Sequence, residues 1–174
     1  NSESQVTKDG KMNEVINGIP DWVNEEEFGF NSALVFTADG SMLCWIKYDE
    51  SKVKQYSLQL FKGRSSELTE NAIYPGTYSY KYPKAGEENS RVSAWSYDIK
   101  SHRIQQLNIP LATDGYMPRI VSTVDPDKIV IYTMNRHQDV LNLYSVNPRS
   151  TISHLLIKES VPKYVKEEAM ANIR

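Results

Sequence analysis

The 174-residue sequence predicts an all-β fold. Short runs of β-branched and aromatic residues occupy the middle of the chain, and turn residues separate them. These runs fall into two successive groups with the same order of hairpins. Because Cys44 is the only cysteine, an intrachain disulfide is impossible and the fold must rest on packing. We therefore expect two packed units of strands.

The first group begins with two apolar runs joined by the turn dipeptide Asp39-Gly40, which is the pattern of a β-hairpin. A second pair of apolar runs follows further along the chain. Cys44 lies between Leu43 and Trp45 in one of these runs, so we expect its thiol to be buried as a small apolar group. The predicted strands are residues 33–37, 42–48, 92–99 and 104–109.

The second group repeats this arrangement. Asp125-Pro126-Asp127 supplies the turn of its first hairpin, and Asn147-Pro148-Arg149-Ser150 supplies the turn of its second. The predicted strands are residues 119–124, 128–134, 140–146 and 152–157.

Repeated four-stranded sheets are the units from which β-propellers are built. We interpret the chain as a fragment of a β-propeller, with about two four-stranded antiparallel blades plus flanking strands. Residues 1–174 then form one partial domain. An immunoglobulin-like sandwich is the alternative fold for this strand pattern. A propeller fragment leaves sheet faces and edges uncovered, so self-association of the fragment is a risk.

An insertion at residues 49–91 separates the second and third strands of the first group. It is rich in tyrosine, and residues 55–61 and 78–82 both alternate in polarity as strands do, which predicts an inserted β arm. Tyrosine suits an interface because it buries a large area and keeps a polar tip. The alternative is a hairpin folded back on its own blade.

Three adjacent acids, Glu25, Glu26 and Glu27, follow Asp21-Trp22 and precede Phe28. Neighbouring carboxylates repel one another, and a bound cation or several hydrogen-bond donors relieve that repulsion. Pro20 and Gly29 favour a segment bounded by turns, so we place the acids on a short helical turn or loop where two of them can converge. The run suggests a site for an amine, but charge runs usually face water, so by itself the pattern favours a solvated surface.

Composition excludes several other kinds of partner. Lys and Arg number 20, Asp and Glu 22, and the formal net charge of −2 argues against a nucleic-acid surface. The chain contains no apolar run long enough to span a bilayer and no signal-peptide pattern.

Other side chains that often carry chemistry receive structural interpretations. The three histidines lack the spacing of metal ligands, so we assign no metal and no cofactor: His102, His137 and His154. Trp45 and Trp95 lie in strand patterns and are expected in the core. Trp22 either lines the site or braces its turn, and Arg136 either pairs with a carboxylate or is solvated.

Three separate motifs resemble one known family. The segment NGIPDWVNEEE at 17–27 is similar to the double-glutamate motif of the dipeptidyl peptidase IV family, and YPKAGEEN at 82–89 resembles its second signature. NRHQ at 135–138, followed by Leu143-Tyr144, is similar to the bacterial branch. The resemblance covers nearly the whole chain but only one part of the family's polypeptide, the N-terminal β-propeller.

In that family, a separate α/β-hydrolase domain carries the catalytic serine, aspartate and histidine. The resemblance therefore implies that this domain is absent from residues 1–174. A G-x-S-x-G nucleophile motif is also absent, since the near match at 63–67 lacks its second glycine. We expect no peptidase activity from these residues alone.

The resemblance also implies a role for two of the acids. The second and third acids of the family motif bind the free α-amino group of a peptide, and they correspond to Glu26 and Glu27. An α-ammonium offers three donors to two carboxylates, so the chemistry fits. Glu25 is expected to face away, and Asn24 departs from the tyrosine that the family often has there.

The implied parent protein is a serine-type dipeptidyl peptidase that releases X-Pro or X-Ala dipeptides in the bacterial periplasm or cell envelope. Its partners would be peptides with a free N-terminus, its own hydrolase domain and a second copy, with which residues 52–82 would help form a homodimer. The alternatives are a tripeptidyl peptidase of the same clan, an inactive relative that acts as a binding module, and a free-standing propeller or sandwich that binds proteins.

Overall fold

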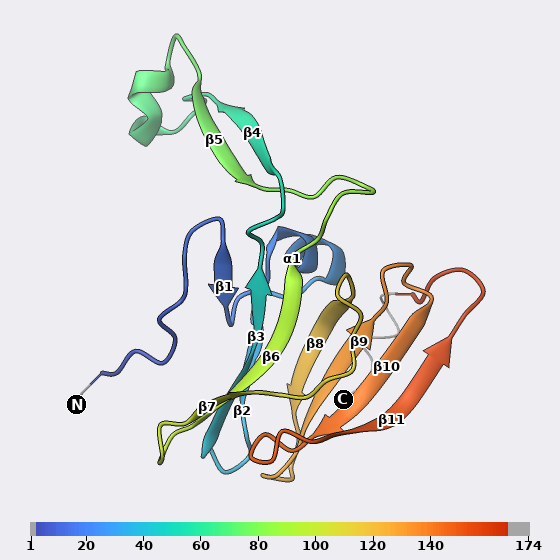
Figure 1. Ribbon diagram of the computed structural model, residues 1–174. Helices are drawn as coiled ribbons and strands as arrows, with labels where there is room; N and C mark the ends of the chain where they lie inside the picture. Colours follow the sequence, from blue (N-terminus) through green and yellow to red (C-terminus); the bar gives the residue numbers. More distant parts are fainter. Residues whose placement is uncertain (1–2, 167–174) are drawn as a thin grey trace.

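The computed structural model describes residues 3–166. Two antiparallel sheets pack against each other, and a two-stranded hairpin projects away from them (Figure 1). The prediction of an all-β chain built from two groups of antiparallel strands is confirmed. Within residues 3–166, none of the helices has the length and apolar character needed to cross a membrane.

The first sheet has five strands, and β2 pairs with β3 outside the main order β1-β3-β6-β7. All neighbours are antiparallel, and β3 and β6 form its longest ladder, from Met42↔Asp98 to Asp49↔Arg91. The strands are β1 (Val15–Asn17), β2 (Leu34–Phe36), β3 (Met42–Asp49), β6 (Arg91–Asp98) and β7 (Ile104–Gln106).

The strands β1 and β2 form one interrupted strand along a single side of β3. Asn17 pairs with Lys47 and Leu34 pairs with Trp45, so the two pieces cover successive parts of β3. The amide of Ala33 donates to the carbonyl of Gly18 at 2.9 Å, which closes the gap. Gly18 has φ +76°, and a Cβ there would lie 3.0 Å from Leu34 Cδ2, so glycine suits this position. Residues 19–32 thus leave the strand and return to it.

The second sheet is a continuous antiparallel meander in the order β11-β10-β9-β8. Its strands are β8 (Tyr116–Ser122), β9 (Ile129–Met134), β10 (Val140–Val146) and β11 (Ser153–Ser160). A register shift between Leu143 and Tyr144 bends the pairing with β11. The predicted strands of both groups agree with the structure to within a few residues at each end.

The core lies between the two sheets. Met42, Cys44, Ile46 and Tyr48 alternate along β3 and are fully buried, as period-two alternation requires. They pack in one cluster with apolar residues of β8, β9 and β10. The prediction that Cys44 is buried is confirmed, and burial raises the pKa of its thiol to about 12.

The two indoles of the first sheet lie on its other face. Trp45 is 4% exposed, and its Nε1 donates to Asn17 Oδ1 at 3.0 Å. Trp95 is only half-buried, with the Lys47 ammonium 5.5 Å from its ring centroid. The expectation that Trp95 is a core residue was therefore wrong, because it faces away from the second sheet.

A polar junction joins the sheets at the end opposite the projecting hairpin (Figure 1). The buried Ser96 hydroxyl donates to the Pro148 carbonyl at 2.8 Å. Arg149 donates to Asp98 Oδ2 at 3.1 Å and lies 3.8 Å from Asp39 Oδ2. The turn between β10 and β11 is thereby tied to two turns of the first sheet.

The chain leaves the first sheet between β3 and β6. There β4 (Gln55–Leu60) and β5 (Gly76–Lys81) pair as a hairpin, with the 3₁₀ helix η1 (Ser66–Asn71) at its far end. We call residues 52–82 the arm. Figure 1 shows it extending away from both sheets, so it is not a hairpin folded back on its own blade.

Candidate functional site

The three acids lie on the short helix α1 (Trp22–Phe28), within the segment that interrupts the first strand. Asp21 caps the helix, since its Oδ1 accepts from the Asn24 amide at 2.9 Å. Gly29 ends it in the left-handed conformation with φ 62°, and its amide donates to the Glu25 carbonyl at 3.0 Å. The predicted short helical turn is confirmed, and both of its boundaries were visible in the sequence.

The helix has one buried side and one open side. Asn24 and Phe28 are buried one turn apart, and the Phe28 ring meets the Tyr116 ring edge-on at 5.5 Å. The side chains of Glu25, Glu26 and Glu27 are all exposed. At about 100° per residue, Glu25 and Glu27 point about 160° apart, so Glu25 faces away from Glu27. Within residues 3–166, neither Glu26 nor Glu27 has an ion-pair partner.

A cavity of about 710 Å³ lies beside the helix. Four other segments complete its wall: the root of the arm, the 82–89 segment, the start of β8 and the loop between β9 and β10. Of the two predicted acids, Glu27 lines the cavity and Glu26 lies on the adjacent exposed face of the helix. The lining residues are Trp22, Val23, Glu27, Tyr56, Leu58, Tyr80, Tyr82, Pro83, Lys84, Ala85, Asn89, Tyr116, Arg136 and Gln138.

Aromatic rings form much of this wall. Trp22 packs against Tyr82 with ring centroids 4.2 Å apart and ring planes tilted by 39°, and Tyr80 lies 6.3 Å from Trp22. Tyr56 packs 5.5 Å from Tyr82. Trp22 therefore does both things that the sequence left open: it lines the cavity and braces the helix.

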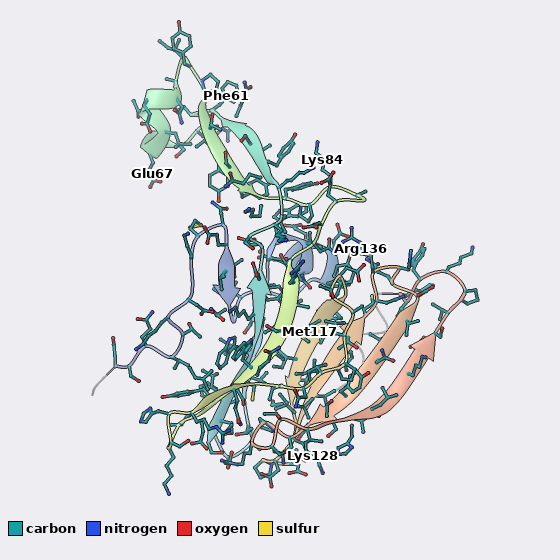
Figure 2. The ribbon with its side chains drawn as sticks, in the orientation of Figure 1. Phe61, Glu67, Lys84, Met117, Lys128 and Arg136 are labelled. Carbon is teal, nitrogen blue, oxygen red and sulfur yellow. The ribbon has the colours of Figure 1, made fainter. Side chains whose placement is uncertain are left out.

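Two cationic side chains, Lys84 and Arg136, also line the cavity. Figure 2 shows Lys84 and Arg136 on the side of the molecule below the arm. The Lys84 ammonium is 5.1 Å from the Tyr56 ring centroid. Arg136 is half-buried, and its Nη2 donates to the Glu87 carbonyl at 2.7 Å. Neither sequence interpretation of Arg136 holds, because within residues 3–166 it pairs with no carboxylate and is not simply solvated.

The cavity also contains an unusual amide. The Nδ2 of Asn89 is buried without a hydrogen-bond partner in the described part of the chain. Asn89 and Arg136 were not predicted as site residues. Both lie in segments that resemble the family, 82–89 and 135–138, but their place in the cavity depends on contacts between distant segments. The alternation of Tyr78, Tyr80 and Tyr82 did place aromatic side chains on one face of the arm.

The histidines lie outside this cavity. His102 contacts the Tyr97 hydroxyl through Nδ1, while His137 and His154 are exposed. No group of three or more potential ligands that could hold a metal ion occurs within residues 3–166. The chemistry of the site is therefore that of carboxylates, aromatic rings and two cations around an open cavity.

The strand order of the two sheets identifies the fold class of this chain. With β1 and β2 counted as one interrupted strand, each sheet is a four-stranded antiparallel unit. Two such units in succession are adjacent blades of a β-propeller. The first blade carries the acidic helix and the arm. The family model for the dipeptidyl peptidase IV (DPP IV) N-terminal region matches residues 1–173. The chain belongs to this family.

Curated relatives from fungi agree with this assignment. The probable dipeptidyl-aminopeptidase B of Talaromyces marneffei is 32% identical over 88% of this chain, and that of Tuber melanosporum is 35% identical over 84%. The alignments cover 18% and 17% of those two proteins. The chain thus spans less than a fifth of the curated relatives it matches.

Solved structures give the same picture. The crystal structure of Porphyromonas gingivalis dipeptidyl peptidase 4 superposes with a TM-score of 0.89 and 37% identity, over 98% of this chain and 23% of that one. A putative dipeptidyl aminopeptidase IV from Bacteroides ovatus superposes with a TM-score of 0.78 and 26% identity, over 95% and 22%. The resemblance inferred from motifs is confirmed for the family and the propeller fold, whereas bacterial origin stays a prediction because the curated relatives are fungal.

Proposed function

We propose that this chain is the substrate-selecting part of a serine-type dipeptidyl peptidase that removes X-Pro or X-Ala dipeptides from peptide N-termini. Glu26 and Glu27 bind the α-ammonium group of the peptide. The observation that carries this proposal is the open acidic side of α1: its carboxylates have no ion-pair partner within residues 3–166, and one of them lines a cavity with aromatic walls.

The chemistry of the cavity suits a short length of peptide. Charge-assisted hydrogen bonds between an ammonium and carboxylates are strong, and the aromatic walls offer an apolar surface to the rest of a bound peptide. An internal peptide bond has no positive charge to place beside the acids. Recognition of the charge therefore restricts binding to free N-termini.

The bond-breaking step belongs to a hydrolase domain of the same polypeptide. Residues 1–174 contain no G-x-S-x-G motif, and the relatives are more than four times as long as the aligned region. A location in the periplasm or cell envelope is part of the proposal, and fractionation of cells that express the full-length protein tests it.

We also propose that the arm contributes to a homodimer of the full-length protein. Its far end exposes apolar side chains that a partner surface would cover, namely Phe61 at 57%, Ile73 at 83% and Tyr74 at 81% exposure. Sedimentation of the full-length protein should show a dimer that is lost when residues 56–81 are replaced by a short glycine-rich turn. A dimer that survives this deletion would remove the arm from the interface.

The amine site is tested in the full-length protein with a Gly-Pro chromogenic substrate. The double variant Glu26→Gln with Glu27→Gln should lower kcat/KM about 100-fold, because two charge-assisted hydrogen bonds are lost. The wild-type enzyme should cleave the substrate that has a free N-terminal amine and should not cleave the N-acetylated substrate. Glu25→Gln is the matched control, since it removes one charge from the other side of the same helix.

Two results would contradict the proposal. Unchanged kinetics of the double variant would show that the acids are a solvated surface. Equal cleavage of the free and acetylated substrates by wild type would show that the enzyme does not read the N-terminal charge.

A further inference from the structure

The orientation of the acids depends on contacts outside their own helix. An isolated helix of seven residues is too short to persist in water, so tertiary contacts must hold α1 in place. Near its C-terminal end, Phe28 packs against Tyr116 of β8 with ring centroids 5.5 Å apart. Near its N-terminal end, the closest ring contact is between Trp22 and Tyr82, at 4.2 Å.

Trp22 lies on the side of the helix that carries the first of the two acids. Residues four apart on a helix are stacked one above the other, so the Trp22 side chain lies one turn below Glu26. Val23 and Glu27 stand in the same relation, and both line the cavity. A rotation of α1 about its axis would therefore move Trp22, Glu26 and Glu27 together.

The partner of Trp22 belongs to the arm rather than to either sheet. Tyr82 is the residue that follows β5 directly, and its ring also contacts Tyr56 at 5.5 Å and Tyr80 at 6.0 Å. The amide of Tyr82 donates to the Lys54 carbonyl at 3.0 Å, which fixes the ring to both sides of the arm's root. Trp22 thus joins the acidic helix to a packed cluster of three tyrosines.

We propose that Trp22 is a positioning residue for the amine site, and that it acts through its ring contact with Tyr82. The arm's root then sets the affinity for the substrate ammonium. This inference rests on the proposed function of Glu26 and Glu27. It adds a residue that does not bind the ammonium itself, and it connects the packing of the arm's root to peptide binding.

The test measures kcat and KM separately in the full-length enzyme, with the concentration of active sites titrated. Trp22→Ala and Tyr82→Ala should each raise KM for a Gly-Pro substrate about three- to tenfold, the range expected for losing one aromatic pair, with a smaller change in kcat. Trp22→Phe keeps an aromatic ring and should restore most of the affinity. Tyr164→Ala, at a position that is 67% exposed and lies outside the arm and the cavity lining, is the matched control and should leave KM unchanged.

The decisive measurement repeats Trp22→Ala in the background of Glu26→Gln with Glu27→Gln. If Trp22 acts by orienting the acids, its effect on KM should fall below about twofold once they no longer bind the amine. An undiminished effect in that background would overturn the inference, because Trp22 would then contact the substrate directly. A lower active-site titre with unchanged KM would also overturn it, since Trp22 would only support folding.

These outcomes separate the two proposals. If the acid variant alone leaves the kinetics unchanged, the amine site itself is wrong and the role of Trp22 falls with it. If the acid variant loses activity while Trp22→Ala and Tyr82→Ala both leave KM unchanged, the amine site stands and only the positioning role is lost. Trp22→Phe and Tyr82→Ala keep the test decisive should Trp22→Ala fail to fold.

Discussion

The two blades share a strand pattern but differ in continuity. The second blade is an uninterrupted meander, whereas the first is broken within its first strand and again between its second and third strands. The ladder between β3 and β6 nevertheless keeps its register over eight residue pairs, although residues 50–90 leave the sheet between those strands. Both insertions contribute to the same cavity. The two insertions thus leave the pairing of the first blade unchanged.

The largest expected effect on stability comes from a substitution in the second blade, which is the uninterrupted one. Ile131 in β9 is fully buried between the sheets, so Ile131→Ala should lower the free energy of unfolding by about 2–5 kcal/mol. Denaturant unfolding of the full-length protein measures the change. The molecules that remain folded should keep the preference for a free N-terminus, because Ile131 does not line the cavity. A changed preference would mean that the second blade also shapes the site.

A smaller effect on stability is expected from a substitution in the 19–32 segment of the first blade. Asp21→Ala removes the acceptor at the start of α1 and should cost about 1 kcal/mol, whereas Asp21→Asn keeps an oxygen there and should cost less. KM for a free-amine peptide should nevertheless rise more for Asp21→Ala than for Ile131→Ala. Kinetics and unfolding curves of both variants check this. If KM rose more for Ile131→Ala than for Asp21→Ala, the second blade would matter more for peptide binding than the 19–32 segment does.

The smallest effect is expected at the junction that joins the blades. Hydrogen bonds from Thr37 and Ser41 lower the pKa of Asp39 to about 2, and backbone amides led by that of Ser101 lower the pKa of Asp98. Because the folded-state values lie below the unfolded values, these carboxylates stabilise the fold above the ordinary pKa of 3.8, and that stabilisation is lost as the pH falls toward about 2.

The thermal unfolding midpoint between pH 5 and pH 2 tests this expectation. The midpoint of wild type should fall more steeply with acid than that of Asp39→Asn, because the variant has no carboxylate at this position to protonate. Parallel curves for the two proteins would show that the junction contributes nothing to the pH dependence.

Local patterns in the sequence predicted much of this structure. The strands followed from alternation, and the short helix followed from Pro20 and Gly29. The contacts that build the cavity did not follow, because they join segments far apart in the chain: Trp22 with Tyr82, and Arg136 with the Glu87 carbonyl. The three-residue strand β1 was also missed, since it is recognisable only by its pairing with β3.

The family motif carried the assignment of Glu26 and Glu27, and physics alone would have left them as a charged surface. The structure adds an asymmetry between them, with Glu27 lining the cavity and Glu26 beside it. A run of identical residues contains no signal for such a difference. Only the rotation of the helix, set by the buried pair Asn24 and Phe28, distinguishes the two acids.

The hydrogen bond between Gly18 and Ala33 makes the first blade a natural site for grafting. The Ala33 amide nitrogen and the Gly18 carbonyl oxygen, which flank the 19–32 segment, lie 2.9 Å apart in the blade, and each doubling of the loop between them adds only about 0.6 kcal/mol of closure cost. Segments of other lengths and compositions can then be exchanged there while the sheet stays intact. A protein engineer could use this position to give a propeller a new binding specificity, and evolution has the same freedom.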